Sequence, residues 1–89
     1  MEEIYQVSIP SQELYSRGNT TASVTHDKDC PKPKVLKAIS DAATKLSESF
    51  SNEPSVRIVP NSETTRTIRT ATGDLKEQTD FDCELTSIL

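Results

Sequence analysis

The sequence predicts an α+β fold of two layers: an antiparallel or mixed sheet of four or five strands with one amphipathic helix packed on one face. Three observations support this prediction. Residues 31–50 carry apolar side chains every three or four positions, which is the period of a helix with one buried face. Shorter stretches before and after that helix alternate polar and apolar residues, as half-buried strands do. Proline, glycine and asparagine lie between these stretches and mark turns.

Two strands are expected before the helix. Residues 4–9 alternate apolar and polar side chains, with Tyr5 predicted on the buried face, and residues 20–26 are rich in β-branched side chains. Gly18 and Asn19 tolerate the positive φ of a tight turn. We therefore expect a hairpin whose return arm is the second of these strands.

The helix is expected to begin at Pro31 or Pro33, since the first helical N–H has no intrahelical acceptor, and to end near Asn52. Its apolar stripe consists of Val35, Leu36, Ile39, Ala42, Ala43, Leu46 and Phe50. We predict that Ile39, Leu46 and Phe50 are buried against the sheet. The strand residues predicted to cover them are Val7, Val24, Val56, Ile58, Phe81 and Leu85.

Three strands are expected after the helix, at residues 55–59, 64–71 and 80–89. The middle stretch has Ile68 as its one large apolar residue, so it is predicted to be an edge strand or a strand that is polar on both faces. Gly73 opens a turn region before the last strand. This order of elements also fits a β-grasp arrangement, in which the first and last strands lie parallel at the centre of the sheet. All 89 residues are expected to form a single domain.

Composition limits the class of protein. The formal net charge of −4 does not favour a general nucleic-acid binder, which normally has a basic excess. No apolar run approaches the length of a membrane span, and the N-terminal residues are acidic where a secretory signal would be basic. We therefore expect a cytoplasmic protein with no membrane partner. Cys30 and Cys83 are expected to be unpaired thiols, although an oxidising compartment would allow a disulfide between them.

Residues 26–30, with the sequence HDKDC, are the densest group of potential metal ligands and nucleophiles. A zinc site draws paired Cys or His ligands from two segments, and here a second segment would have to lie near Cys83. Cys30 would need His26 as its base, and the chain has no second histidine. A polar loop that leads into a helix explains the same pattern. We therefore expect a non-enzymatic protein with no metal and no cofactor.

Three groups of charged residues are candidate partner-binding sites. The start of the helix is crowded by Lys28, Lys32, Lys34 and Lys37, where a phosphate or a partner's carboxylates could bind. The C-terminal part carries Asp74, Glu77, Asp80, Asp82 and Glu84, which could dock a basic surface. The strands carry Arg57, Arg66 and Arg69. Arg66 and Arg69 point to opposite faces of a regular strand, because their spacing is odd.

These features favour a small protein-binding module that acts as a subunit, an adaptor or an inhibitor of a larger protein. A phage- or mobile-element-encoded inhibitor of a host enzyme would fit this description, and the partner could also be a second copy of the chain. The threonine-rich stretch 64–71 could add its free backbone groups to a partner's strand. The alternative is a nucleic-acid-binding protein that uses the lysines of the helix start and the strand arginines.

Overall fold

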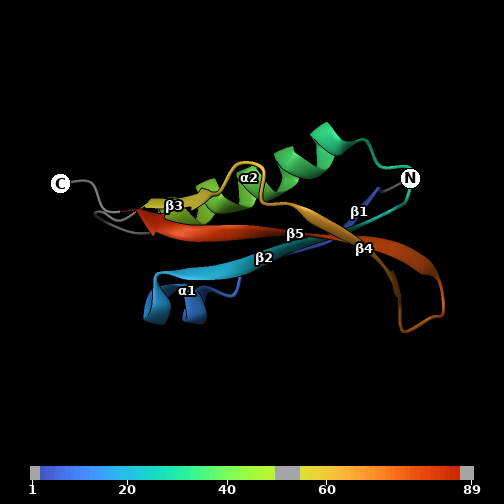
Figure 1. Cartoon of the computed structure of the whole chain (residues 1–89), viewed down its shortest axis with the longest axis horizontal. Helices are drawn as coiled ribbons and strands as arrows, with labels where there is room; N and C mark the ends of the chain where they lie inside the picture. Colours follow the sequence, from blue (N-terminus) through green and yellow to red (C-terminus); the bar gives the residue numbers. More distant parts are fainter. Residues whose placement is uncertain (1–2, 50–54, 87–89) are drawn as a thin grey trace.

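A computed structural model of the chain describes residues 3–49 and 55–86. Within these residues the chain forms, in order, β1 (Ile4–Ser8), α1 (Ser11–Arg17), β2 (Asn19–His26), α2 (Lys32–Glu48), β3 (Ser55–Ile58), β4 (Thr64–Arg69) and β5 (Leu75–Thr86). The predicted α+β class is confirmed, with five strands in one sheet and α2 on one of its faces (Figure 1). In the described ranges, no helix is both long enough and apolar enough to cross a membrane.

The 12-residue strand β5 is the centre of the sheet. One side of β5 pairs with β2, and β2 in turn pairs with β1. The other side pairs with β3 near the C-terminal end of β5 and with β4 near its N-terminal end. Every pairing is antiparallel and β1 lies at an edge, so the β-grasp arrangement is wrong: the first and last strands are neither neighbours nor parallel.

The strands β3 and β4 run along the same side of β5 and are separated by a short break. The turn at the break contains Pro60 and Asn61, and Asn61 has a positive φ of 60°. Val59 still donates its backbone N–H to the carbonyl of Asp82 at 2.8 Å. The N–H of Asp82 then donates to the hydroxyl of Ser62 at 3.0 Å. Ser62 therefore replaces a backbone acceptor and keeps β5 hydrogen-bonded across the break.

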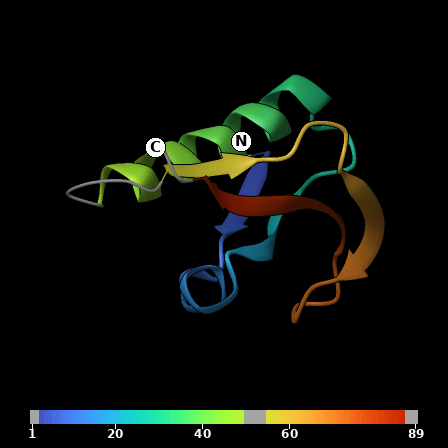
Figure 2. The same cartoon turned by 60° about the vertical axis from the view of Figure 1, so that its left-hand side comes forward.

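Helix α2 lies across one face of the sheet (Figure 2), and the core lies between them. Its buried members are Leu14, Ala22, Val24, Val35, Ile39, Ala43, Val56, Phe81 and Cys83. The six strand residues predicted to cover the helix are confirmed as part of the core or packed against it, with Val7, Ile58 and Leu85 among the partly buried ones. The helix stripe is narrower than predicted: the buried residues of α2 are Val35, Ile39 and Ala43, whereas Leu46 is only partly buried and Leu36 is 37% exposed. The predicted burial of Phe50 and the cap at Asn52 lie outside the described residues.

Local structure before α2 differs from the predicted hairpin. Residues 11–17 form the helix α1, which ends at Gly18 with φ 82° and buries Leu14 completely. The positive φ expected of a turn is therefore used to end a helix. A bulge in β1 between Ile4 and Gln6 also turns Tyr5 away from the core, so its predicted burial is wrong and it is 49% exposed. The last strand begins at Leu75, earlier than predicted, since the turn at Gly73 is short.

Candidate functional site

The face of the sheet opposite α2 is polar along the two central strands. Side chains alternate between faces, and the buried residues of β2 and β5 all lie on the α2 side. The other face therefore carries Asn19, Thr21, Ser23 and Thr25 from β2 and Lys76, Gln78, Asp80, Asp82 and Glu84 from β5. We call this surface the open face. It presents hydroxyl, amide and carboxylate groups, which favour polar contacts with a partner.

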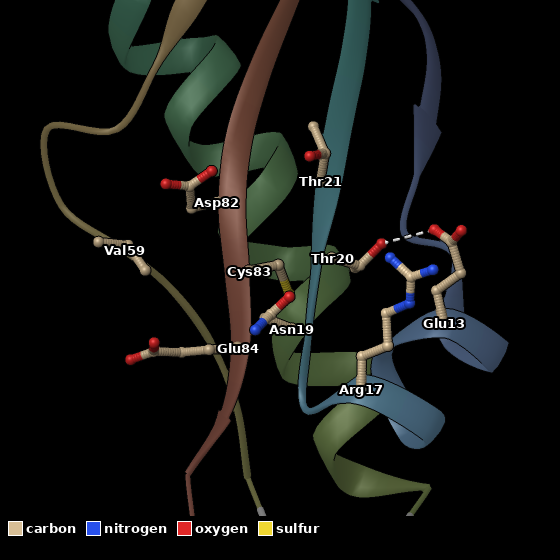
Figure 3. A pocket seen from close by; sticks show the side chains of 9 residues that line it. All are labelled: Glu13, Arg17, Asn19, Thr20, Thr21, Val59, Asp82, Cys83 and Glu84. Carbon is tan, nitrogen blue, oxygen red and sulfur yellow. Dashed lines mark hydrogen bonds between the residues drawn. The ribbon is translucent and has the colours of Figure 1, made fainter.

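The open face is hollowed at the end where β2 begins. A cavity of about 540 Å³ lies there, lined by Glu13, Arg17, Asn19, Thr20, Thr21, Val59, Asp82, Cys83 and Glu84 (Figure 3). Helix α1 forms one wall, held in place by the buried side chain of Leu14. The hydroxyl of Thr20 donates to Glu13 Oε2 at 3.1 Å, which fixes that wall to β2. Sequence reasoning missed this wall because it expected a turn in place of α1.

The carboxylates of Asp80, Asp82 and Glu84 form a row along β5. Every second residue of a strand lies about 7 Å further along, so the row is evenly spaced. Its two outer members face cations: Glu84 lies 2.8 Å from Arg57 Nε, and Asp80 lies 3.9 Å from Arg66. Asp82 is exposed and has no ion-pair partner among the described residues. The centre of the row is therefore available to a cation from outside.

The other two acidic residues of the predicted group lie elsewhere. Asp74 lies in the turn before β5, where its carboxylate accepts a hydrogen bond from the hydroxyl of Thr72 at 3.0 Å. Glu77 points to the α2 side of the sheet, in the register position opposite His26. The structure thus brings together three of the five predicted acidic residues. The division follows from the strand period, because odd and even positions of β5 belong to different faces.

The lysines near the start of α2 do not form a free basic patch. Lys32 pairs with Glu63 at 3.2 Å and Lys37 pairs with Asp41 at 3.1 Å. Lys34 pairs with Glu3, and this hydrogen-bonded partner raises the pKa of the lysine. Lys28 is exposed and has no ion-pair partner among the described residues.

The three strand arginines are also dispersed. Arg57 and Arg66 lie on the open face beside carboxylates, as described above. Arg69 points to the opposite face from Arg66, as predicted, and donates to the carbonyl of Gly73 at 2.9 Å. The predicted basic sheet surface is therefore divided into single cations with neighbouring acceptors.

An ion pair that the sequence did not reveal closes the far end of the open face. Lys76 Nζ lies 2.9 Å from Asp27 Oδ1 and 2.7 Å from the hydroxyl of Tyr5. It also lies 4.2 Å from the centre of the Tyr5 ring, a cation–π distance. Hydrogen bonds to Tyr5 and Asp27 raise the pKa of Lys76, and the hydrogen bond from Lys76 lowers the pKa of Asp27. This cluster joins β1 to β5 across β2 and explains why the bulge turns Tyr5 outward.

The segment from His26 to Cys30 has a structural role. His26 Nδ1 lies 2.8 Å from the carbonyl of Asp27, so Nδ1 is the donor, and Nε2 accepts from the hydroxyl of Thr79 at 2.7 Å. Cys30 and Cys83 are both unpaired, as expected, and burial raises the pKa of each thiol. A raised pKa disfavours the thiolate that a nucleophile needs.

The part of the chain that the structure describes contains no group of three or more His, Cys, Asp or Glu side chains that could hold a metal ion. Comparisons of the chain with protein-family models, with curated proteins and with solved structures gave no match. The described surface can bind a partner through ion pairs and hydrogen bonds. The row of carboxylates on β5, Asp80, Asp82 and Glu84, is the candidate site for such contacts.

Proposed function

We propose that this protein is a small non-enzymatic binding module that docks a basic region of a larger protein on its open face, as a subunit, an adaptor or an inhibitor. The observation that carries the proposal is the row Asp80, Asp82 and Glu84, whose central carboxylate has no cationic partner among the described residues. The hollow beside α1 includes Asp82 and Glu84 in its lining, so it offers a concave surface next to these carboxylates. A basic side chain on the β5 side of the hollow would meet Asp82 and Glu84, whereas Glu13 lies on the α1 side next to Arg17 (Figure 3).

The arrangement also supports specificity. Thr21 and Asn19 line the same hollow and supply hydrogen-bonding groups with a fixed position on β2. A row of charges at an interface mainly raises the rate at which the partner associates and fixes the position in which it binds. Arg57 and Arg66, at the two ends of the row, would repel a cation that approached out of register. We propose a cytoplasmic location, and the two unpaired thiols support it.

The test is capture of a partner with a matched pair of charge reversals. Asp82→Lys places a cation at the centre of the row, whereas Glu48→Lys makes the same change in net charge at an exposed position at the end of α2. Tagged wild type should retain a stoichiometric protein from a lysate of the source cells. The Glu48→Lys variant should retain it equally well, and the Asp82→Lys variant should lose it.

The partner retained by wild type should be released as salt increases, because exposed charge pairs are screened. Equal retention by the two variants would show that the open face is not the interface. Recovery of nucleic acid in place of a protein would favour the lysine-based alternative and contradict the proposed function.

A further inference from the structure

We infer that the outer edge of β4 is a second binding site, which takes an acidic extended peptide as an added strand and buries one apolar side chain of that peptide. The site lies on the side of β4 away from β5. It shares one residue with the open face, because Arg66 lies 3.9 Å from Asp80 at one end of the acidic row. The outward backbone groups of β4, the cavity and Arg69 are not part of the open face, so the inference goes beyond the proposed function and either proposal can fail without the other.

The hydrogen-bond pattern shows which backbone groups of β4 face outward. In an antiparallel pair, hydrogen-bonded residues alternate with residues whose N–H and C=O point away from the partner. Val59 donates to Asp82, and Thr70 donates to Asp74 at 2.9 Å, so the even-numbered residues of β5 carry the bonds on this side. Since Arg66 pairs with Gln78, the outward residues of β4 are Thr65, Thr67 and Arg69, which are all exposed.

The neighbouring strand β3 lies on the same side of β5, but its outward groups at Val56 are occupied. Val56 donates its N–H to the hydroxyl of Ser47 at 2.8 Å, so α2 covers that edge. Beyond the break, β4 lies away from α2 (Figure 2). Among the described residues, no strand other than β5 pairs with β4. An extended chain could therefore pair with β4 while β3 stays closed.

A cavity beside Thr65 gives this edge a place for a side chain. It has a volume of about 190 Å³ and is lined by His26, Cys30, Lys32, Val35, Glu63, Thr65, Glu77, Thr79 and Phe81. An apolar cavity of about 150 Å³ is large enough for benzene. The residue of an added strand opposite Thr65 would place its side chain on the α2 side of the sheet, next to this cavity.

The lining of the cavity favours an apolar occupant. Val35 and Phe81 supply apolar surface from α2 and β5. The polar atoms of His26 and Thr79 bond to each other at 2.7 Å, and Thr79 also bonds to Thr65 at 2.9 Å. These two groups already have partners, and Lys32 pairs with Glu63 at 3.2 Å, so none of the four needs a polar ligand. Glu77 is the polar residue of the lining that has no ion-pair partner among the described residues. An aliphatic side chain fits the site best.

Charge selects the rest of the peptide. Residues 64–69 contain Arg66 and Arg69 and no carboxylate. Antiparallel pairing of β4 with β4 of a second copy would place two arginines on each face of the new strand pair, and like charges across strands are destabilising. A peptide with acidic side chains opposite these two arginines would be attracted instead. In antiparallel register, the pattern is acidic, any, any, acidic, apolar.

The test uses fluorescence anisotropy with the labelled peptide TEVTELT at physiological salt. Its two glutamates lie opposite Arg69 and Arg66, and its leucine lies opposite Thr65. The peptide TEVTEAT should bind about tenfold more weakly, because the apolar side chain is truncated. The peptide TKVTKLT should bind more weakly still. The inference would be overturned if TEVTELT showed no saturable binding, or if the lysine peptide bound equally well. Arg66 and Arg69 would then serve only to prevent other chains from pairing with the free edge of β4.

Two variants of one residue test the strand pairing itself. Thr67→Pro removes an outward N–H that β5 does not use, and proline is tolerated on such an edge. Thr67→Val keeps the N–H and the shape of the side chain. Peptide affinity should fall about tenfold or more in the proline variant and stay within about twofold of wild type in the valine variant. Circular dichroism and melting must show that both variants are folded.

Hydrogen exchange of wild type gives a readout that does not depend on folding of a variant. Bound peptide should slow exchange of the amides of Thr65, Thr67 and Arg69, and leave Arg66 and Ile68, which β5 already protects, nearly unchanged. Uniform protection, or dimerisation of the chain through β4, would contradict the inference. The Asp82→Lys and Glu48→Lys variants should bind the peptide equally, which separates this site from the open face.

Discussion

Ile39 is the residue on which the docking of α2 depends most. Its side chain is fully buried at the middle of the helix, between Val35 and Ala43 on the same buried stripe. Replacement by alanine removes apolar contacts and leaves a cavity, because the backbone of a helix packed on a sheet relaxes only in part. Buried isoleucines replaced in this way lower stability by about 2–5 kcal/mol.

That loss is large compared with the stability of a domain of this size. Natural domains have about 0.05–0.15 kcal/mol per residue, which gives about 4–13 kcal/mol here. With a urea dependence of about 1.5 kcal/mol per molar, a loss of about 3 kcal/mol lowers the midpoint by about 2 M. Ile39→Ala should therefore be partly unfolded in buffer if the wild type lies at the low end of this range.

The assay is urea unfolding followed by circular dichroism, with Ser40→Ala as the matched control. Ser40 is the next residue along α2 and is exposed, so its replacement should change the free energy of unfolding by no more than about 0.5 kcal/mol. Leu46→Ala should fall between these two variants, since Leu46 is only partly buried. Equal midpoints for Ile39→Ala and Ser40→Ala would refute the assigned face of α2.

Two further predictions follow from single contacts. Ser47→Ala leaves the N–H of Val56 without its acceptor. In the same urea assay, this change should lower the free energy of unfolding by about 1–2 kcal/mol. A loss no larger than that of Ser40→Ala would show that water replaces the hydroxyl. Asp27 has a lowered pKa in the folded chain, so its contribution to stability is present above the ordinary pKa of about 3.9 and is lost as pH falls through the folded value. Urea midpoints between pH 5 and pH 2.5 should therefore decline less steeply for Asp27→Asn than for wild type, and parallel declines would contradict the ion pair with Lys76.

The sequence was informative wherever a period extends over several residues. The pattern of Val35, Ile39 and Ala43 predicts the helix, and the alternation of Phe81 and Cys83 with Asp82 and Glu84 predicts both faces of β5. The acidic row is therefore visible before folding, once the strand is assigned. The local signal at Gly18 was ambiguous, because a positive φ serves a tight turn and the end of a helix equally well.

Other features could not be predicted, since they depend on pairs that are distant in the chain. Helix α1 has seven residues and one buried side chain, Leu14, which is too little for a period to be recognised. The ion pairs of Lys34 with Glu3 and of Lys32 with Glu63 form only after α2 has packed on the sheet. The bulge at Tyr5 likewise depends on Lys76, from a strand near the other end of the described chain.

The central position of β5 has a consequence for the order of folding. The hairpin of β4 and β5 joins neighbours in the chain, with Arg69 opposite Leu75, and such local contacts close quickly. The pairing of β2 with β5 joins residues more than about 50 positions apart, as in His26 with Glu77, and must first overcome the entropy of closing that loop. Until β5 is in place, β2, β3 and β4 have no common neighbour. We expect a slow, concerted late step in which the hairpin meets β2 under α2, with early structure confined to α2 and the hairpin.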